Sequence, residues 1–335
     1  MVSSLTAVQS QDYPGAKWSV GQRVRGGSDT AVDEAFSSGR ILRTHVLRPT
    51  WHFVAPDDIR WLLRLTAPRV HTIIAYYNRG LELDGRLFAR AHAVFGKALE
   101  GGRHLTRAEL ADELAKAKII ARGQRLAHIV AHAELDALIC SGALRGKQHT
   151  YALLDEREPA GRILDREEAV AELVRRFFVS HGPATLKHFA WWSGLTMADG
   201  KAGLSTVQAQ LNRIEADGRT YWTGTSAPRA NRMPARAYLI PEYDEALIGS
   251  RDLAISDLPR TRRGWKDAWY RPVMIEGKRA GTWRRAISGG RVVVSVNLFT
   301  TLDSRQRRML GAAVERHARF LGLPTATPSW AAGRP

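Results

Sequence analysis

The chain has 335 residues, and its 44% hydrophobic content is enough for packed cores in two or three domains. Its 50 Lys and Arg against 33 Asp and Glu give a net charge of +17, which favours a polyanionic partner such as nucleic acid. One cysteine excludes an intrachain disulfide, and the sequence shows no signal peptide and no apolar run long enough for a membrane span, so we expect a cytoplasmic protein.

The first distinctive pattern is AVQSQDYPG, residues 7–15, where Gln9 and Gln11 stand just before a turn. We expect an extended segment here, on which side chains two positions apart point the same way. The two amides are then either the polar face of a short strand or a pair that holds one ligand. Asp12 points away from them on such a segment and is expected to cap the following turn.

The next elements are a short helix over 29–39 and a β-hairpin over 43–54. One face of this hairpin carries, in alternation, Arg48, Thr50 and His52. These side chains could contact DNA, or they could belong to a hairpin tip that is simply packed within the protein. Helical patterns then begin at Asp57, at about residue 70 and at residue 84. We assign residues 1–104 to a first unit, in which residues 1–54, with their helix and hairpin, could be the remains of a shortened winged helix.

Residues 105–160 have the element order of a winged helix-turn-helix. Thr106 and Glu109 have the spacing of a capping box, and a longer helix is predicted to run to Gly142, with Cys140 buried near its end. A hairpin follows around Gly146 and Lys147. Arg145 and Lys147 on this predicted wing are candidates for phosphate contacts, with ordinary surface charge as the alternative.

Residues 161–226 repeat that order. Helices are predicted from 165, from Pro183 and from Thr196 to about residue 218, followed by a strand at RTYWTG. Trp191 and Trp192 could stack on an extruded base, but such a pair is more often core, and core packing is the interpretation that we favour.

The last region, residues 227–335, overlaps a loop-like stretch over 225–237. The chain after this stretch is rich in strand-like sequence patterns. VMIEGKRAGTWRRAI and RVVVSVNLF suggest strands of a small β-barrel, closed off by a terminal helix. Residues 251–335 carry 17 Lys and Arg against 6 Asp and Glu. Arg284 and Arg285 in this basic region are further candidates for DNA contacts.

A metal site is not predicted. His128 and His132 have the i, i+4 spacing of zinc ligands on a helix, but Ile129 stands where a metalloprotease carries glutamate, and no third ligand is evident. The chain also has no glycine-rich phosphate loop, and no cofactor is expected.

Five strings in one order now support a family resemblance. AVQSQDYPGAKWSV, RTHVLRPTWHFVAPDD, HGPATLKHFAWWSGLT, LIPEYDEALIG and GTWRR together resemble the bacterial winged-helix DNA glycosylases of the AlkZ-like family, from about residue 5 to 322. The resemblance implies an α+β fold of three tandem winged helices and a C-terminal β-barrel around a basic DNA channel. It also implies a base-excision-repair enzyme that hydrolyses the N-glycosidic bond of alkylated purines in double-stranded DNA, including interstrand crosslinks. Because the units are in tandem and no coiled-coil dimer seam is evident, we expect a monomer.

The family's catalytic signature is Gln-x-Gln or Gln-x-Asp, and the matching residues here are Gln9 and Gln11. Neither amide is a general base near neutral pH, but each can hold a water and a sugar oxygen together. A cationic N7-alkylguanine is already activated as a leaving group, so positioned amides could suffice. The nearest lysine is Lys17, and we expect no lyase activity. The alternative is a winged-helix regulator without catalysis, which would usually bind DNA as a dimer.

Overall fold

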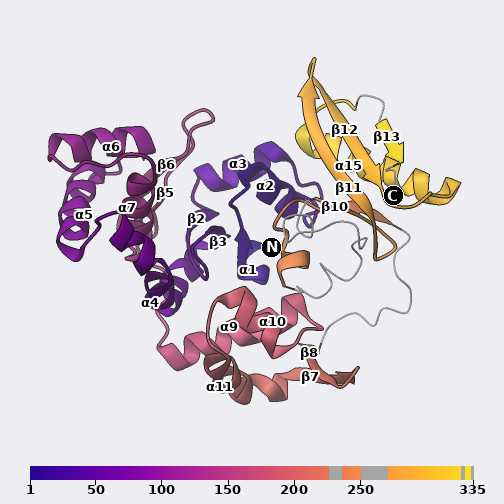
Figure 1. Ribbon diagram of the computed structural model, residues 1–335, viewed down its shortest axis with the longest axis horizontal. Coiled ribbons are helices and arrows are strands. Elements are labelled where there is room, and N and C mark those ends of the chain that lie inside the picture. Colours follow the sequence, from indigo (N-terminus) through magenta and orange to yellow (C-terminus); the bar gives the residue numbers. More distant parts are fainter. Residues whose placement is uncertain (226–235, 250–270, 326–328, 333–335) are drawn as a thin grey trace. The chain divides into compact units, whose positions relative to one another are not determined.

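The computed structural model describes residues 1–225, 236–249, 271–325 and 329–332 (Figure 1). The chain divides into two compact units. Unit one contains Met1, Val8–Val32 and Ser226–Pro335, and unit two contains Val2–Ala7 and Asp33–Thr225. The four-part division of the chain stays a prediction, and most of the expected loop over 225–237 lies outside the described residues.

The middle of unit two is built from seven consecutive elements. They are α4 (Pro56–Gly80), α5 (Gly85–Leu99), β4 (Leu105–Thr106), α6 (Arg107–Lys116), α7 (Gly123–Leu135), β5 (Ile139–Ser141) and β6 (Thr150–Leu153). The strands pair in the order β4-β6-β5. Thr106 and Glu109 form the predicted capping box at the start of α6, and apolar side chains of α5, α6 and α7, such as Phe95, Leu110 and Ile129, share one core.

Two predicted boundaries in this region are wrong. The expected restart of a helix near residue 70 is absent, because α4 continues through Pro68 to Gly80. The helix expected to reach Gly142 ends at Leu135, and Ala137 adopts a left-handed backbone conformation, with φ of 57°, before β5. Cys140 therefore lies in a strand, not in a helix. It is buried as predicted, and burial raises the pKa of its thiol to about 12.

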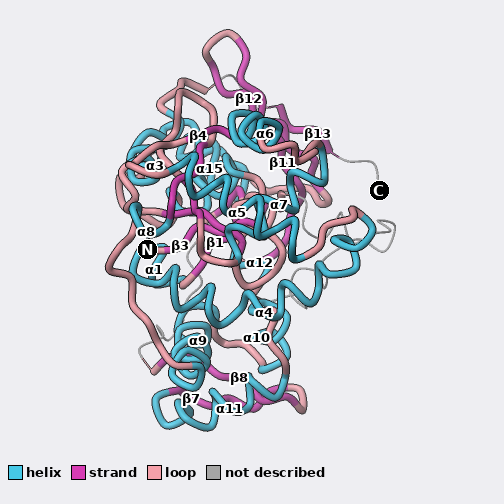
Figure 2. Tube along the Cα trace, turned by 90° about the vertical axis from the view of Figure 1, so that its left-hand side faces the viewer, coloured by secondary structure: helices cyan, strands magenta, loops and turns pink. Residues whose placement is uncertain are grey.

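The C-terminal part of unit two is again a group of helices followed by a hairpin, and most of these elements lie together at the lower end of Figure 2. It consists of α8 (Leu154–Arg157), α9 (Arg166–His181), α10 (Leu186–Ser193), α11 (Met197–Val207), the 3₁₀ turn η1 (Gln208–Gln210), β7 (Leu211–Ala216) and β8 (Arg219–Gly224). Capping boxes at Asp165, Thr185 and Thr196 start α9, α10 and α11. The helix predicted from Thr196 stops at Val207, because the chain then pairs as β7 with β8.

A hairpin near the N-terminal side of unit two matches the prediction for residues 43–54. Strands β2 (Leu42–His45) and β3 (Trp51–Val54) are antiparallel, with Leu42 opposite Val54. It is preceded along the chain by α1 (Val2–Leu5), β1 (Ala7–Gln9), α2 (Tyr13–Gly21) and α3 (Asp29–Ser37). The order of helix, short extended segment, two helices and hairpin thus occurs twice, and a third time with a single β-bridge, between Ala184 and Trp222, in place of the short strand.

Unit one is organised around a five-stranded sheet in the order β13-β12-β11-β10-β9. The strands are β9 (Ala237–Leu239), β10 (Pro272–Ile275), β11 (Lys278–Ser288), β12 (Arg291–Leu298) and β13 (Ser329–Ala332). Figure 1 shows β11 and β12 as a long hairpin, with α15 (Ser304–Leu321) beside the sheet. Among the described strands β9 and β13 are edges, so the predicted barrel is a curled, open half-barrel.

Tryptophan side chains attach α2 and β11 to the rest of unit one. The indole N–H of Trp18 donates to the Leu239 carbonyl oxygen at 2.7 Å, and that of Trp283 donates to the Ile240 carbonyl oxygen at 2.7 Å. Gly21 ends α2 against Phe320 of α15, where a Cβ atom would come within 2.2 Å of the ring. The lack of a side chain at Gly21 therefore allows α2 and α15 to pack closely.

Candidate functional site

Gln9 and Gln11 lie at the junction between β1 and α2 in unit one. Gln9 is the last residue of β1 and is 8% exposed, whereas Gln11 is exposed in a bend two residues before α2. The expectation of one extended segment through Gln11 is therefore wrong, because the chain must turn to begin α2 at Tyr13. The two amides remain neighbours in sequence, with Gln9 buried and Gln11 accessible.

Two buried carboxylates hold this junction in place. The backbone N–H of Gln9 donates to Oε1 of Glu245 at 2.7 Å, across 236 residues of sequence. Asp244 accepts two hydrogen bonds from the Arg23 guanidinium, at 2.5 and 2.8 Å, and one from the Ser19 hydroxyl at 2.7 Å. Its Oδ1 also caps α12 (Glu245–Ile248) through the backbone N–H of Ala246. The end of β1 and the helix α2 are thus both attached to α12.

Neither carboxylate was predicted from the sequence as part of the site. Both belong to LIPEYDEALIG, one of the strings that carry the family resemblance. The available signal was a pair of adjacent acids between apolar runs, since charged side chains are rarely fully buried unless they have partners.

A narrow cleft lies beside Asp12, the residue after Gln11, and charged side chains line it. It is lined by Asp12, Arg271, Arg285 and His317, with Trp18 and Trp283 among its walls. Asp12 makes no side-chain cap for α2, contrary to the prediction. Its carboxylate instead pairs with Arg271 at 3.3 Å. Burial lowers the pKa of Arg285, against the opposing effect of Asp12. Arg285 is thus close to the Gln-x-Gln segment, whereas its neighbour Arg284 is exposed.

His317 is fully buried at this cleft. Neither of its ring nitrogens has a hydrogen-bond partner among the residues that the structure describes. Trp18 and Trp283 contact the ring edge-on, with centroids 4.7 and 5.1 Å away. Burial, and then the positive charges of Arg285 and Arg271, lower the pKa of His317 to about 3. The imidazole is therefore neutral at physiological pH.

We expect His317 to make unit one sensitive to acid. Its pKa rises from about 3 when folded to 6.5 when unfolded, so the unfolded chain binds the extra proton between these values. The free energy of unfolding should fall by about 1.4 kcal/mol per pH unit across that range because of this group, and should not depend on it above pH 6.5. Urea titrations from pH 7 to 4 should show a shallower loss in His317→Leu than in wild type. Equal slopes would contradict this assignment.

Arg48, Thr50 and His52 come together at the β2–β3 loop of unit two. His52 is fully buried, and its Nδ1 donates to the Thr50 carbonyl oxygen at 2.9 Å, so its Nε2 can accept from Arg48 at 3.4 Å. Arg48 also donates to the Trp192 carbonyl oxygen at the end of α10. Trp192 is fully buried against Phe177, as predicted for core, whereas the same prediction is wrong for Trp191, which is 37% exposed. His52 therefore orients Arg48, which is partly exposed, as is Thr50.

Arg145 and Lys147 lie on the hairpin loop between β5 and β6. Arg145 and Gln148 exchange two backbone hydrogen bonds, and the turn between them uses Gly146 with φ of 61°. Arg145 pairs with Glu109 at 2.7 Å. Hydrogen bonds from the Thr106 backbone and from Arg145 lower the pKa of Glu109 to about 2. Lys147 is exposed at the tip, so it is the better placed of the two for a phosphate.

We expect Lys147→Ala to weaken binding to damaged and undamaged duplex by the same factor. A phosphate contact carries no sequence information, and its loss should reduce the slope of log K against log salt by about 1. Fluorescence anisotropy at several salt concentrations measures this slope. Lys116→Ala is the control, because Lys116 is exposed but already paired with Glu113 at 2.7 Å. An unchanged slope in Lys147→Ala would remove Lys147 from the DNA contacts.

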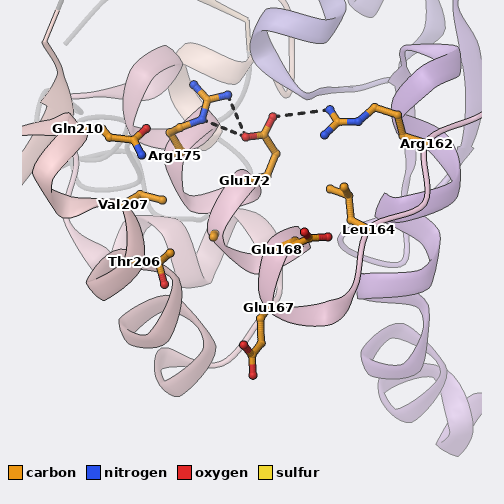
Figure 3. Close-up of a pocket in the computed structure, with 10 residues that line it drawn as sticks. Arg162, Leu164, Glu167, Glu168, Glu172, Arg175, Thr206, Val207 and Gln210 are labelled. Atoms are coloured by element: carbon orange, nitrogen blue, oxygen red, sulfur yellow. Dashed lines mark hydrogen bonds and ion pairs between the residues drawn. The ribbon is translucent and has the colours of Figure 1, made fainter.

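A surface hollow of about 500 Å³ lies elsewhere in unit two, between α9 and the end of α11 (Figure 3). It is lined by Glu167, Glu168 and Glu172, with Arg162 and Arg175 as its basic side chains. Glu172 is already paired with Arg175 at 2.9 Å. The acidic balance of this hollow does not favour the DNA backbone, and none of the predicted site residues lines it.

A family model described as DNA glycosylase AlkZ-like matches residues 2–320. The chain therefore belongs to the AlkZ-like DNA glycosylase family. Members of this family are hydrolases acting on N-glycosyl bonds. A relative of this AlkZ-like chain is the Interstrand DNA cross-link repair glycosylase of Streptomyces sahachiroi, 22% identical over 337 residues, covering 95% of this chain and 88% of the relative.

The solved structure of Streptomyces sahachiroi DNA glycosylase AlkZ has the same fold. The match has a TM-score of 0.77 at 19% identity and covers 98% of this chain and 92% of the other. The mixed helix-and-sheet fold expected for an AlkZ-like chain is thus confirmed. No helix among the described residues of this AlkZ-like chain is long and apolar enough to cross a membrane.

Proposed function

We propose that this AlkZ-like glycosylase hydrolyses the N-glycosidic bond of alkylated purines, N7-alkylguanine above all, including guanines in interstrand crosslinks. The crosslink activity is suggested by the name of the relative from Streptomyces sahachiroi, a glycosylase of interstrand DNA cross-link repair. The observation that carries the proposal is the attachment of the Gln-x-Gln segment to a buried carboxylate. Glu245 fixes the backbone at Gln9, while Gln11 is exposed two residues further on.

Gln9 and Gln11 would position the attacking water and the deoxyribose. Each neutral amide offers one acceptor oxygen and two donor hydrogens, so it can orient water without removing its proton. A cationic N7-alkylguanine leaves with less assistance, since bond cleavage neutralises its charge. Fixed dipoles of the two amides would then stabilise the developing positive charge on the sugar.

The reaction would end at an abasic site without strand cleavage by the protein. Lys17, the lysine nearest to Gln11 in sequence, is 6% exposed and pairs with Asp29 at 2.8 Å. An amine that is buried and held in this ion pair is not accessible to the sugar, so Lys17 is poorly placed to act as a nucleophile. We therefore propose a monofunctional glycosylase that needs no metal or cofactor for catalysis.

Basic side chains of both units would hold double-stranded DNA. We propose phosphate contacts for Arg284 and Arg285 in unit one and for Arg48, Arg145 and Lys147 in unit two, with His52 and Thr50 supporting Arg48. The three repeats of the helix-and-hairpin order would be winged-helix units that bind DNA, and the protein would act as a monomer at the nucleoid.

Release of damaged base tests the proposal. Duplexes containing N7-methylguanine or a nitrogen-mustard crosslink are incubated with the protein, and abasic sites are revealed by alkali. Base release from a lesion duplex, with the matched undamaged duplex left intact, is expected. No release from either lesion, together with tight sequence-specific binding to undamaged DNA, would overturn the proposal and favour a winged-helix regulator.

A further inference from the structure

Three histidines and an aspartate from different helices meet in the middle of unit two. His71 lies on α4, His92 on α5 and His132 on α7, and Asp136 is the residue that follows the end of α7. Each side chain is partly exposed: 28% for His71, 19% for His92, 18% for His132 and 40% for Asp136. Solvent and small ions can therefore reach the cluster, whereas the proposed catalytic residues belong to unit one.

The distances within the cluster fit a shared metal ion. His71 Nε2 is 2.9 Å from Oδ1 of Asp136, His132 Nδ1 is 3.2 Å from Oδ2 of Asp136, and His132 Nδ1 is 3.3 Å from His92 Nε2. Ligand atoms of His71, His132 and Asp136 all lie within 4.8 Å of one another. Tetrahedral ligands at zinc distances are separated from each other by roughly 3.4 Å.

Local structure fixes the position of each ligand. His132 and Asp136 are four residues apart at the end of α7, so they lie on the same side of that helix. The His132 ring stacks on Phe88 of α5, with centroids 3.6 Å apart, which restricts its rotation. His128 is not part of the cluster, because its Nδ1 contacts Oδ1 of Asn78 at 2.7 Å. The pair that matters on α7 is thus His132 and Asp136, not His128 and His132.

We propose that His71, His92, His132 and Asp136 bind one transition-metal dication of the Zn²⁺ type. Imidazole nitrogens and a carboxylate oxygen are ligands that zinc, cobalt and nickel accept. The ion connects α4, α5 and α7, and so stabilises this part of unit two. Its role is structural, and the hydrolysis at Gln9 and Gln11 does not pass through it.

Titration with Co²⁺ tests the site on the full-length, tag-free protein after treatment with chelator. We expect one Co²⁺ per chain, the visible absorption of tetrahedral cobalt, and displacement by Zn²⁺. Loss of an outer partner of a metal site already weakens binding by about 10–100-fold, so His71→Gln and His92→Gln should each weaken Co²⁺ binding by about 100-fold or more. His128→Gln, from the same helix as His132, should bind as wild type does.

Two outcomes would overturn the proposal. One is the absence of saturable Co²⁺ binding to the wild-type chain, which would leave the cluster as a hydrogen-bonded ion-pair network. The other is equal affinity in His71→Gln, His92→Gln and His128→Gln. Circular dichroism checks that the variants fold. Should a variant unfold, the wild-type protein still gives a result, since Zn²⁺ at one equivalent must raise its thermal midpoint and Mg²⁺ must not.

Discussion

Base excision by Gln9→Ala and Gln11→Ala should be slower than wild type by about 10²–10³-fold, the loss typical of removing one fixed dipole from an active site. Affinity for the lesion duplex should change little, because neither amide is proposed to contact phosphate. Gln11 is exposed, and the hydrogen bond from Gln9 to Glu245 uses the backbone N–H, which alanine retains. Both variants should therefore fold.

Single-turnover release of N7-methylguanine measures this rate directly. Gln210→Ala is the matched control: Gln210 is an exposed glutamine in the acidic hollow beside α11 and is expected to leave the rate unchanged. Wild-type rates in both Gln9→Ala and Gln11→Ala would remove the Gln-x-Gln segment from catalysis. Retained excision would at the same time keep the assignment as a glycosylase, so the two conclusions are separable.

Asp244→Ala should destabilise unit one by about 3–5 kcal/mol, since breaking a buried ion pair leaves the other charge without compensation. The carboxylate of Asp244 is fully buried and accepts hydrogen bonds from Arg23, Ser19 and the N–H of Ala246. Its loss leaves the guanidinium of Arg23, 25% exposed, without this partner and detaches α2 from α12. We therefore also expect the backbone that carries Gln9 and Gln11, between β1 and α2, to be displaced in this variant.

Urea denaturation followed by tryptophan fluorescence checks this loss, because Trp18 and Trp283 report on unit one. Asp155→Ala is the control. Asp155 also pairs with an arginine, Arg60 at 2.8 Å, but its side chain is 86% exposed, and such pairs contribute about 0–1 kcal/mol. If the urea midpoint of Asp244→Ala is as high as that of Asp155→Ala, the buried carboxylate of Asp244 does not stabilise unit one.

The catalytic role proposed for Gln9 and Gln11 would link catalysis to stability through two adjacent carboxylates. Asp244 holds α2, and Glu245 holds the backbone where β1 ends. Because Gln11 lies between these two attachments, small movements of α12 would displace its amide relative to Gln9. An active site that works by positioning alone depends on such fixed geometry, since a misplacement of 1 Å can cost about 100-fold in rate.

The elements that sequence predicted well are those set by neighbouring residues. The capping boxes at Thr106 and Thr196, the hairpin of β2 and β3, and the turn at Gly146 depend on contacts within a few positions. Elements that depend on distant packing were misplaced. Pro68 lies inside α4, and residues 211–216 leave a helical pattern to pair with β8.

The same contrast, between local patterns and contacts that are distant in sequence, applies to the candidate site. The Gln-x-Gln motif and the basic hairpin residues are visible in the sequence, because they rest on residue type and short spacing. The partners of that motif are not, since Glu245 is 236 residues from Gln9 and Asp244 is 221 residues from Arg23. The histidine cluster was also not predictable from the sequence, because His71 and His92 lie on helices other than the one that carries His132.

By itself, the sequence determined the family, the basic charge, the capping boxes at Thr106 and Thr196 and the two neutral amides that exclude a general base at this motif. Tertiary structure alone decided that Gln9 is buried and Gln11 exposed, that His317 stays neutral, and that Asp244 and Glu245 hold the junction. The physical reason is the distance in sequence between the interacting groups. Hydrogen bonds of caps and turns form between near neighbours in the chain, whereas burial and desolvation depend on all the groups that folding brings around a side chain.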